Sequence, residues 1–156
     1  MRKSRSQGGF TIIEVLIVIM IIGVLAALVL PSVRLNTARV KVSEALIAAG
    51  PCKSMVSEIY ISGGDPPSPG NWGCEITANA STYVDSVGTD DVGTIIVSLR
   101  GFNDLRLDFH VLTLAPLDNT GNLPSGTGSQ IRRWRCGSLV DGTDVPAQFL
   151  PSTCKG

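Results

Sequence analysis

A run of 21 almost entirely apolar residues, Phe10–Leu30, constrains this chain more than any other feature of its sequence. At a rise of 1.5 Å per residue, about 20 apolar residues in a helix cross the hydrocarbon core of a bilayer. The run contains one ionisable residue, Glu14, and an acid at this depth costs roughly 2.5–3.5 kcal/mol on insertion scales. The sequence therefore predicts a membrane-spanning helix in which Glu14 has a functional role.

The nine residues that precede this run, Met1–Gly9, form a short basic leader that ends in two glycines. The leader has no acid, which favours the cytoplasmic side of the membrane for this end of the chain. Its basic residues are Arg2, Lys3 and Arg5. Cleavage between Gly9 and Phe10 would place a new α-amino group four residues before Glu14. Such a cation would make the intramembrane acid tolerable.

Two ordinary alternatives account for part of this pattern. A secretory signal peptide also has a basic start, but its apolar segment is usually about 7–15 residues long and precedes the cleavage site. The apolar run here is longer, and the nearest approach to a small-residue cleavage site after it is Ala26-Ala27-Leu28. A plain signal anchor fits the length and the basic flank, yet it leaves Glu14 unexplained.

The segment from Gly9 to Val18, with the sequence GFTIIEVLIV, resembles the class III signal of type IV pilins and related pseudopilins. In that family a dedicated peptidase of the inner membrane cuts after the glycine and methylates the new amino terminus. The resemblance implies that Phe10 becomes the methylated first residue of the mature chain. It also implies that Glu14 neutralises the terminal amine of a neighbouring subunit during filament assembly.

Beyond Pro31 the sequence has the pattern of an amphipathic helix. Apolar residues recur at alternating steps of three and four, which is typical of a helix with one buried stripe. This stripe comprises Leu35, Ala38, Val42, Ala45, Ala49, Cys52, Val56 and Ile59. A single long helix is therefore predicted for Phe10–Ile61. Gly23, Pro31 and Pro51 disfavour helical structure, and kinks are expected at the two prolines. By resemblance to pilins, the stretch between Gly23 and Pro31 loses helicity in the filament.

Four cysteines, all beyond the apolar run, indicate disulfide bonds in an oxidising compartment, and they allow three pairings. Cys52 lies on the buried stripe, and Cys74 follows a loop rich in glycine and proline at 63–70. A Cys52–Cys74 bond would tie this loop to the helix, and it is the pairing we favour. The chain has one histidine and no Cys-x-x-Cys motif, so neither a metal site nor another cofactor site is predicted.

Several segments after the loop have the patterns of β-strands. β-Branched residues are frequent in Thr94–Arg100, and apolar and polar residues alternate from Leu105 to Val111. Turn-forming residues at Asp118–Asn122 precede another candidate strand, Ile131–Cys136. Together with the long helix, these segments predict an α+β fold in which the helix packs on an antiparallel β-sheet.

The last 23 residues carry a second resemblance, to type IVa major pilins. Trp134-Arg135-Cys136 is similar to the Trp-x-Cys strand that leads into the disulfide-bounded C-terminal loop of that family, and Leu150-Pro151 precedes Cys154 as in the end of that loop. The resemblance implies a Cys136–Cys154 bond. Most family members have this bridge alone, so Cys52–Cys74 is an addition.

The composition argues against two functional classes. Removing the leader leaves ten basic and 13 acidic side chains, a formal charge of −3, so nucleic acid is not expected as an obligate partner. No Gly-x-Ser-x-Gly motif and no Ser/His/Asp set is recognisable, so an enzyme is not predicted.

Three arginines around Trp134 suggest one further contact. They are Arg132, Arg133 and Arg135. Arginines beside an aromatic residue can engage phosphates and stacked bases, so DNA is one candidate partner for them. Acids of neighbouring subunits, or water alone, are the alternatives.

The resemblance as a whole implies the major subunit of a type IV pilus, an extracellular fimbrium that serves surface attachment and twitching motility, with DNA uptake as a further role. On this interpretation the chain consists of a leader at 1–9, a transmembrane and filament-core segment at 10–30, and an amphipathic helix with a periplasmic or extracellular head at 31–156. A minor pilin with a binding role and a pseudopilin of a type II secretion system are the alternatives. The implied partners are other copies of the chain, the prepilin peptidase, the assembly platform with its ATPases, the secretin and, before assembly, the bacterial inner membrane.

Overall fold

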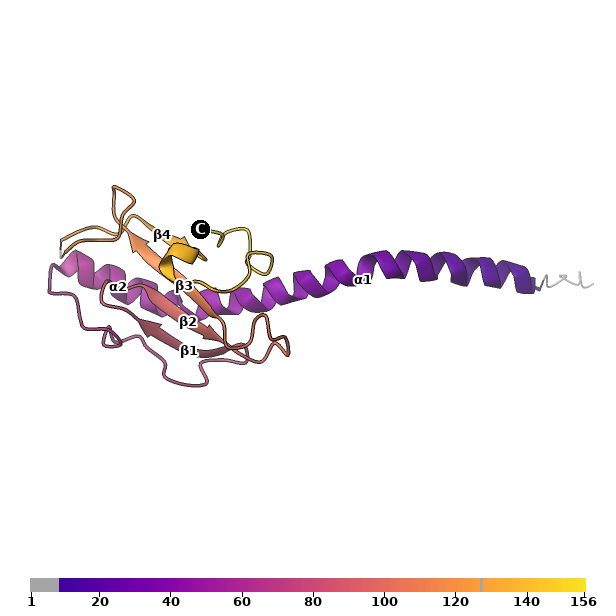
Figure 1. Cartoon of the computed structure of the whole chain (residues 1–156), viewed down its shortest axis with the longest axis horizontal. Coiled ribbons are helices and arrows are strands. Elements are labelled where there is room, and N and C mark those ends of the chain that lie inside the picture. The colour runs from indigo at the N-terminus through magenta and orange to yellow at the C-terminus, as the bar shows by residue number, and fades with distance from the viewer. Residues whose placement is uncertain (1–8, 127) are drawn as a thin grey trace, which may run out of the picture. The chain divides into compact units, whose positions relative to one another are not determined.

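The computed structural model describes residues 9–126 and 128–156, which form two helices, four strands and a short 3-10 helix (Figure 1). The elements are α1 (Ile12–Ala48), α2 (Gly50–Ser62), β1 (Val84–Thr89), β2 (Ile95–Leu99), β3 (Val111–Leu117), β4 (Arg133–Cys136) and η1 (Leu139–Asp141). The chain divides into two compact units, one up to Leu35 and the other Asn36–Gly156. Helix α1 contributes to both.

The first unit consists of the apolar part of α1. The helix continues through Gly23 and Pro31. The loss of helicity expected between them concerns the filament and remains a prediction. The predicted leader lies outside the described residues apart from Gly9, and so do its basic side chains, Arg2, Lys3 and Arg5.

The helix predicted at 10–61 is divided in two next to Pro51. The structure ends α1 at Ala48, and α2 begins at Gly50 with the proline in its first turn. Proline has no N–H, so it cannot donate a hydrogen bond to the preceding turn. The hydrogen bonding resumes immediately, because the Lys53 N–H donates to the Ala49 carbonyl oxygen at 3.1 Å. The interruption is therefore local.

The four strands of the second unit form one antiparallel sheet in the order β1-β2-β3-β4. Strand β2 confirms the prediction for Thr94–Arg100, and β4 confirms the core of the prediction for Ile131–Cys136. Strand β1 was not predicted. Representative pairs in the ladder are Val87 with Val97, Ile96 with Thr113 and Ala115 with Arg135. The outer strands are therefore β1 and β4.

The prediction of a strand from Leu105 to Val111 was wrong, because only its last residue belongs to β3. Residues 104–109 form turns in which the Leu107 N–H donates to the Asp104 carbonyl oxygen at 2.9 Å. The Asp108 carboxylate accepts the Asp104 N–H at 3.2 Å and closes the turn. Leu105 is 86% exposed and Leu107 is buried. The alternation of apolar and polar residues thus reflects a turn that is stabilised by its own carboxylates.

The core of the second unit lies between the helices and one face of the sheet (Figure 1). The predicted helix stripe is buried at Val42, Ala45, Ala49, Cys52 and Val56. Towards the end of α2, Tyr60 is buried and Ile59 only partly so. Tyr60, Val56 and Trp72 form a buried cluster against which Trp134 of β4 packs. The predicted α+β fold, a long helix packed on an antiparallel sheet, is confirmed.

Candidate functional site

The apolar half of α1 has a surface that is exposed on every side. Every large apolar side chain between Phe10 and Val29 is at least 49% exposed. By length and composition this helix could cross a membrane. Monomeric soluble proteins rarely leave so large a continuous apolar surface in water, and a helix that is apolar all round is normally buried in protein or lipid. This surface therefore needs a lipid bilayer or other helices to cover it.

Glu14 lies in the first turn of this helix, where its N–H donates to the Thr11 carbonyl oxygen at 3.1 Å. The positive end of the helix dipole favours a carboxylate at this place. Within the described part of the chain, the carboxylate has no ion-pair partner. Together with Phe10, Val15 and Val18 it lines a surface cavity of about 240 Å³. The first turn thus combines an apolar hollow with one carboxylate.

The outward side of the helix in the second unit carries another apolar stripe, which sequence reasoning missed. Val40 and Ile47 lie seven residues apart on α1 and are 71% and 76% exposed, and Ile61 of α2 is 72% exposed. Seven residues are close to two helical turns, so Val40 and Ile47 project from the same side of α1. The signal was present in the sequence as this spacing, but Ser54 interrupts it. We call Val40, Ile47 and Ile61 the outer stripe.

Both pairings favoured from the sequence are present in the structure as disulfide bonds. Cys52 of α2 is bonded to Cys74, and Cys136 of β4 is bonded to Cys154. The first bond holds the segment after α2 against the helix. The second closes the C-terminal segment onto the outer strand of the sheet.

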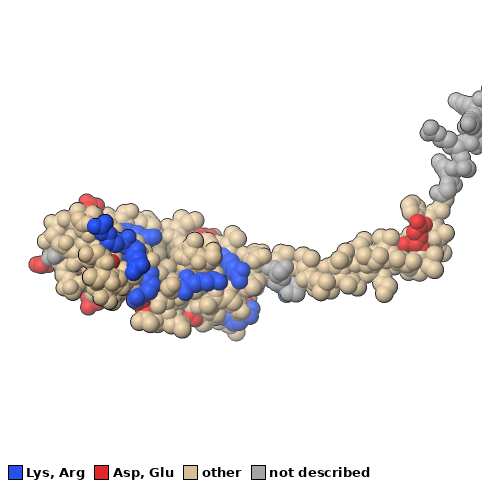
Figure 2. Space-filling view, turned by 90° about the horizontal axis from the view of Figure 1, so that it is seen from above, with Lys and Arg blue, Asp and Glu red and all other residues tan. Residues whose placement is uncertain are grey.

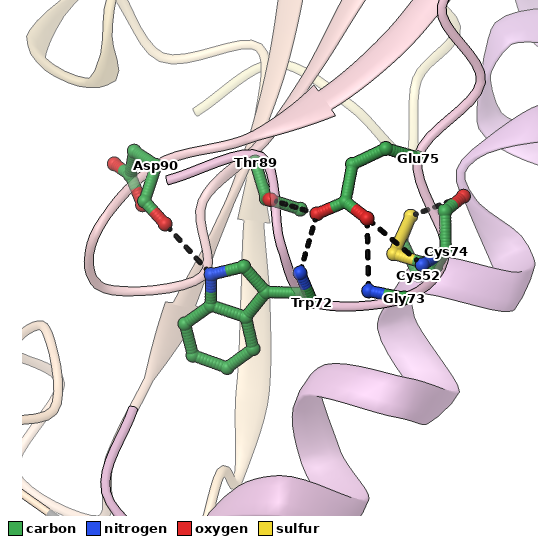
Figure 3. The surroundings of a disulfide bond; sticks show 7 residues. All are labelled: Cys52, Trp72, Gly73, Cys74, Glu75, Thr89 and Asp90. Atoms are coloured by element: carbon green, nitrogen blue, oxygen red, sulfur yellow. Dashed lines mark hydrogen bonds between the residues drawn. A yellow bond between two sulfur atoms is a disulfide. The ribbon is translucent and has the colours of Figure 1, made fainter. Parts of the chain in front are cut away.

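The backbone around Cys74 wraps a single carboxylate, that of Glu75 (Figure 3). One oxygen of Glu75 accepts the Trp72 N–H at 2.7 Å, and the other accepts the N–H groups of Gly73 and Cys74 at 2.9 and 3.0 Å. The Thr89 hydroxyl of β1 donates to the same carboxylate. Partial burial raises the pKa of Glu75, but the hydrogen bonds from Thr89 and the backbone outweigh it and lower the pKa below its usual value. The carboxylate thereby fastens the disulfide loop to the sheet.

Of the three arginines around Trp134, the structure places Arg133 and Arg135 along one hollow and Arg132 along another. The Trp134 ring packs against the α2 cluster, with the Lys53 ammonium 5.7 Å from its centroid. Arg135 forms two hydrogen bonds to the carboxylate of Asp141, which raise the pKa of the guanidinium further. Arg133 is exposed and belongs to the same strand.

Arg132 lies just before β4 and is exposed. It lines a separate hollow of about 270 Å³ beside residues 128–130. The three arginines therefore do not form one cluster, and contact of any of them with DNA or a neighbouring subunit remains a prediction.

Comparison with known protein families shows to which family a chain with this apolar helix and disulfide-bonded sheet unit belongs. Residues 38–155 match the family model of pilins, which are bacterial filament proteins. Residues 4–30 match the prokaryotic N-terminal methylation motif. The chain belongs to the pilin family. The members of this family are structural subunits of filaments, and the exposed apolar helix of this pilin is the element that the methylation motif covers.

Individual relatives cover almost the whole of this pilin. The fimbrial protein EcpC of Eikenella corrodens is 38% identical over 152 residues, which are 96% of this chain and 91% of that protein. The type IV major pilin protein PilE1 of Neisseria gonorrhoeae is 33% identical over 176 residues, 96% of this chain and 94% of that protein. The type IV major fimbrial protein FimA of Dichelobacter nodosus is 30% identical, with 96% of each chain covered.

Proposed function

We propose that this pilin is the major subunit of a type IV pilus, assembled by bundling of its N-terminal helices after removal of a leader. The observation that carries the proposal is the surface of α1 from Ile12 to Val29, which is apolar and exposed on every side. The names of the relatives, type IV major pilin and type IV major fimbrial protein, support the major role.

Before assembly, the same helix holds the subunit in the inner membrane as a single span. The basic leader at 1–9 stays on the cytoplasmic side, and the unit beyond Leu35 is exported, where its two disulfides form. The leader is then cleaved after Gly9 by the prepilin peptidase, and the new amino group of Phe10 is methylated. These steps rest on the methylation motif at 4–30.

The freed amino group of Phe10 then pairs with Glu14 of a neighbouring subunit. A carboxylate in the first helical turn, beside an apolar hollow and without an ion-pair partner in the described residues, suits this role. The pair sets the register between subunits more than it adds stability, because buried ion pairs often barely offset their desolvation. Burial of apolar surface, at about 25 cal/mol for each Å², supplies the stabilisation.

The outer stripe extends this packing surface into the second unit. Val40, Ile47 and Ile61 are exposed on the side of the helix that does not face the sheet. We assign this side to the filament core, where the helix of another subunit covers it. The assembly platform, its ATPases and the secretin are the partners that this route requires. The assembled fibre serves surface attachment and twitching motility.

The test is the intact mass of the protein in filaments sheared from cells, before and after reduction. We expect the dominant species to be methylated Phe10–Gly156, and we expect reduction to add four hydrogens because both disulfides open. Processed protein that stays in the membrane fraction would indicate a pseudopilin, and a trace species in the fibres a minor pilin. Uncut protein that starts at Met1 would overturn the proposal.

A matched pair of variants tests the role of Glu14. Glu14→Ala subunits should be exported and oxidised normally but absent from sheared fibres, because the neighbouring amine has no partner. Asp65→Ala removes an exposed acid from the loop after α2, outside both the apolar run and the outer stripe, and should leave fibre yield unchanged. Well-ordered Glu14→Ala fibres that form at the normal rate would contradict the proposed pairing.

A further inference from the structure

A groove of about 330 Å³ lies between the outer strand β4 and the C-terminal segment of the chain. Arg133 and Arg135 line one wall, and Thr153, Lys155 and Gly156 line the other. Figure 2 shows one face of the second unit, on which several Lys and Arg side chains lie close together. A groove of this volume can hold a small ligand or one unit of a larger one.

Covalent and hydrogen bonds hold the two walls of the groove together. The Cys136–Cys154 disulfide joins them at one point. The Gly156 N–H donates to the Cys136 carbonyl oxygen at 2.7 Å and continues the pairing along the free edge of β4. The groove is therefore already formed in the free subunit, and a ligand does not have to order it first.

The charge in the groove is positive and uncompensated. Arg135 is neutralised by Asp141, whose side chain is only 4% exposed. Within the described residues, Arg133 and Lys155 have neither an ion pair nor a hydrogen bond from their charged groups. Among the residues that the structure describes, no Asp or Glu side chain lines the groove. Two cationic side chains thus line one cavity that has no acidic side chain of its own.

The arrangement of donors indicates which anion fits. Arg133 presents a planar fork of N–H groups, Lys155 a compact ammonium, and Thr153 a hydroxyl, and they come from two different walls. A tetrahedral oxyanion directs its oxygens in several directions, so it can accept from both walls at once. We propose that this groove is a binding site for a phosphate group.

The position of the Trp134 ring argues against recognition of a nucleic-acid base in this groove. Although Trp134 lines the groove, its ring packs on the cluster of Val56, Tyr60 and Trp72, and Lys53 lies over it. Stacking of a base needs a free aromatic face, which this ring does not offer. The groove therefore recognises the phosphate itself, whether it belongs to a monoester such as glycerol 3-phosphate or to the diester backbone of a nucleic acid.

The test uses the full-length chain, labelled with ¹⁵N, in micelles of an uncharged detergent at constant ionic strength. Inorganic phosphate is the first probe, and the readout is the shift of the Gly156 and Thr153 amides and of the Arg133 Nε–H. We expect saturable shifts confined to the groove. Affinity should fall by about tenfold or more in Arg133→Ala/Lys155→Ala, because two charge-assisted contacts are lost.

Arg132→Ala is the matched control, since Arg132 is exposed one residue away and lines the separate hollow. Its affinity for phosphate should equal that of the unchanged chain. The spectrum of the double variant also reports whether the fold is retained. Shifts that do not saturate, or that are the same in the double variant, would overturn the proposal.

Two further probes distinguish the sources of the phosphate. Glycerol 3-phosphate represents a phosphate monoester, and a short oligothymidylate represents a single-stranded diester. Tighter binding of the oligonucleotide assigns the groove to a nucleic-acid backbone. In that case a plot of the logarithm of the binding constant against the logarithm of the salt concentration should have a slope of about −0.7 for each phosphate contacted. Saturation by glycerol phosphate with no gain for the oligonucleotide assigns it to a monoester. Failure of both to saturate counts against the site.

Discussion

The Arg135 guanidinium and the Asp141 carboxylate form a two-pronged ion pair that joins β4 to η1. The Arg135 Nε donates to one carboxylate oxygen at 2.7 Å, and Nη2 donates to the other at 2.6 Å. The side chain of Asp141 is 4% exposed and that of Arg135 is 29% exposed. Because it is less exposed to water, the Asp141 carboxylate therefore relies more on the ion pair for stabilisation of its charge than the Arg135 guanidinium does.

This asymmetry predicts unequal effects of removing the two partners. Arg135→Ala leaves a buried carboxylate without a cation and should destabilise the second unit by roughly 2 kcal/mol, less than a fully buried pair would lose. Asp141→Ala should cost less, because the Arg135 head can turn to water. Urea unfolding of the full chain in detergent, followed by the fluorescence of Trp72 and Trp134, measures both.

The Arg106–Asp104 pair provides the control for this prediction. Its N–O distance is 2.7 Å, but the Arg106 side chain is 63% exposed. Arg106 also lies over the Phe149 ring, at 5.0 Å from its centroid. Arg106→Ala should cost about 1 kcal/mol at most. A loss for Arg106→Ala equal to that for Arg135→Ala would show that burial of Asp141 is not what matters.

Glu75 predicts a dependence of stability on pH. Its pKa is lowered from the usual value of 4.5 in the folded chain, since the hydrogen bonds from Thr89 and the backbone outweigh the effect of burial. A lowered folded pKa means that the unfolded chain takes up the proton first as the pH falls. The stabilisation by Glu75 is therefore complete above pH 4.5 and is lost as the pH falls from there through the folded pKa.

Glu75→Gln tests this dependence. The amide keeps one acceptor oxygen but turns an NH₂ group towards backbone N–H donors, so we expect a loss of about 1–2 kcal/mol at pH 7. The difference from the unchanged chain should shrink when unfolding is repeated between pH 5 and pH 3. Glu58→Gln, at an exposed position of α2, should show no such dependence. A constant difference across this range would contradict the role given to the Glu75 charge.

The parts of the fold that could be predicted are those with a repeating pattern. The stripe that includes Val42, Ala45 and Ala49 has helical spacing over many turns, and β2 has a run of β-branched residues. Strand β1 was not predicted because Asp85 and Gly88 have low strand propensity. In the folded chain, pairing with β2 outweighs this low propensity.

The candidate sites likewise include some that could be recognised from the sequence and some that could not. The apolar run and Glu14 could be recognised because membrane helices have a specific length and almost no charge. The Glu75 network and the Arg135–Asp141 pair depend on which backbone N–H groups and acids the folded loops bring together. That information is tertiary, and the sequence around Glu75 has no periodicity that would indicate it.

Replacing Gly93 by alanine should create steric overlap in the core, whereas the same replacement at Gly88 should not. Gly93 is buried with a φ of +79°, and a Cβ there would lie 2.7 Å from Val56 Cγ1 and 3.0 Å from the Trp72 ring. Gly93→Ala should therefore cost about 2–3 kcal/mol through strain and overpacking. Gly88→Ala, in β1, would meet nothing within 4 Å and should change stability little. Equal urea midpoints for the two variants would contradict this packing.

The outer stripe predicts a variant that folds but does not assemble. Ile47 is 76% exposed in the single subunit, so Ile47→Asp should change the free energy of unfolding by only about 0.5 kcal/mol. In a helix bundle the same carboxylate would be buried without a partner, which costs several kcal/mol and should lower the yield of sheared fibres by about tenfold or more. Val140→Asp is the matched control, because Val140 lies in η1 and is 88% exposed. If Ile47→Asp subunits formed fibres at the yield of Val140→Asp, the outer stripe would have no part in the filament core.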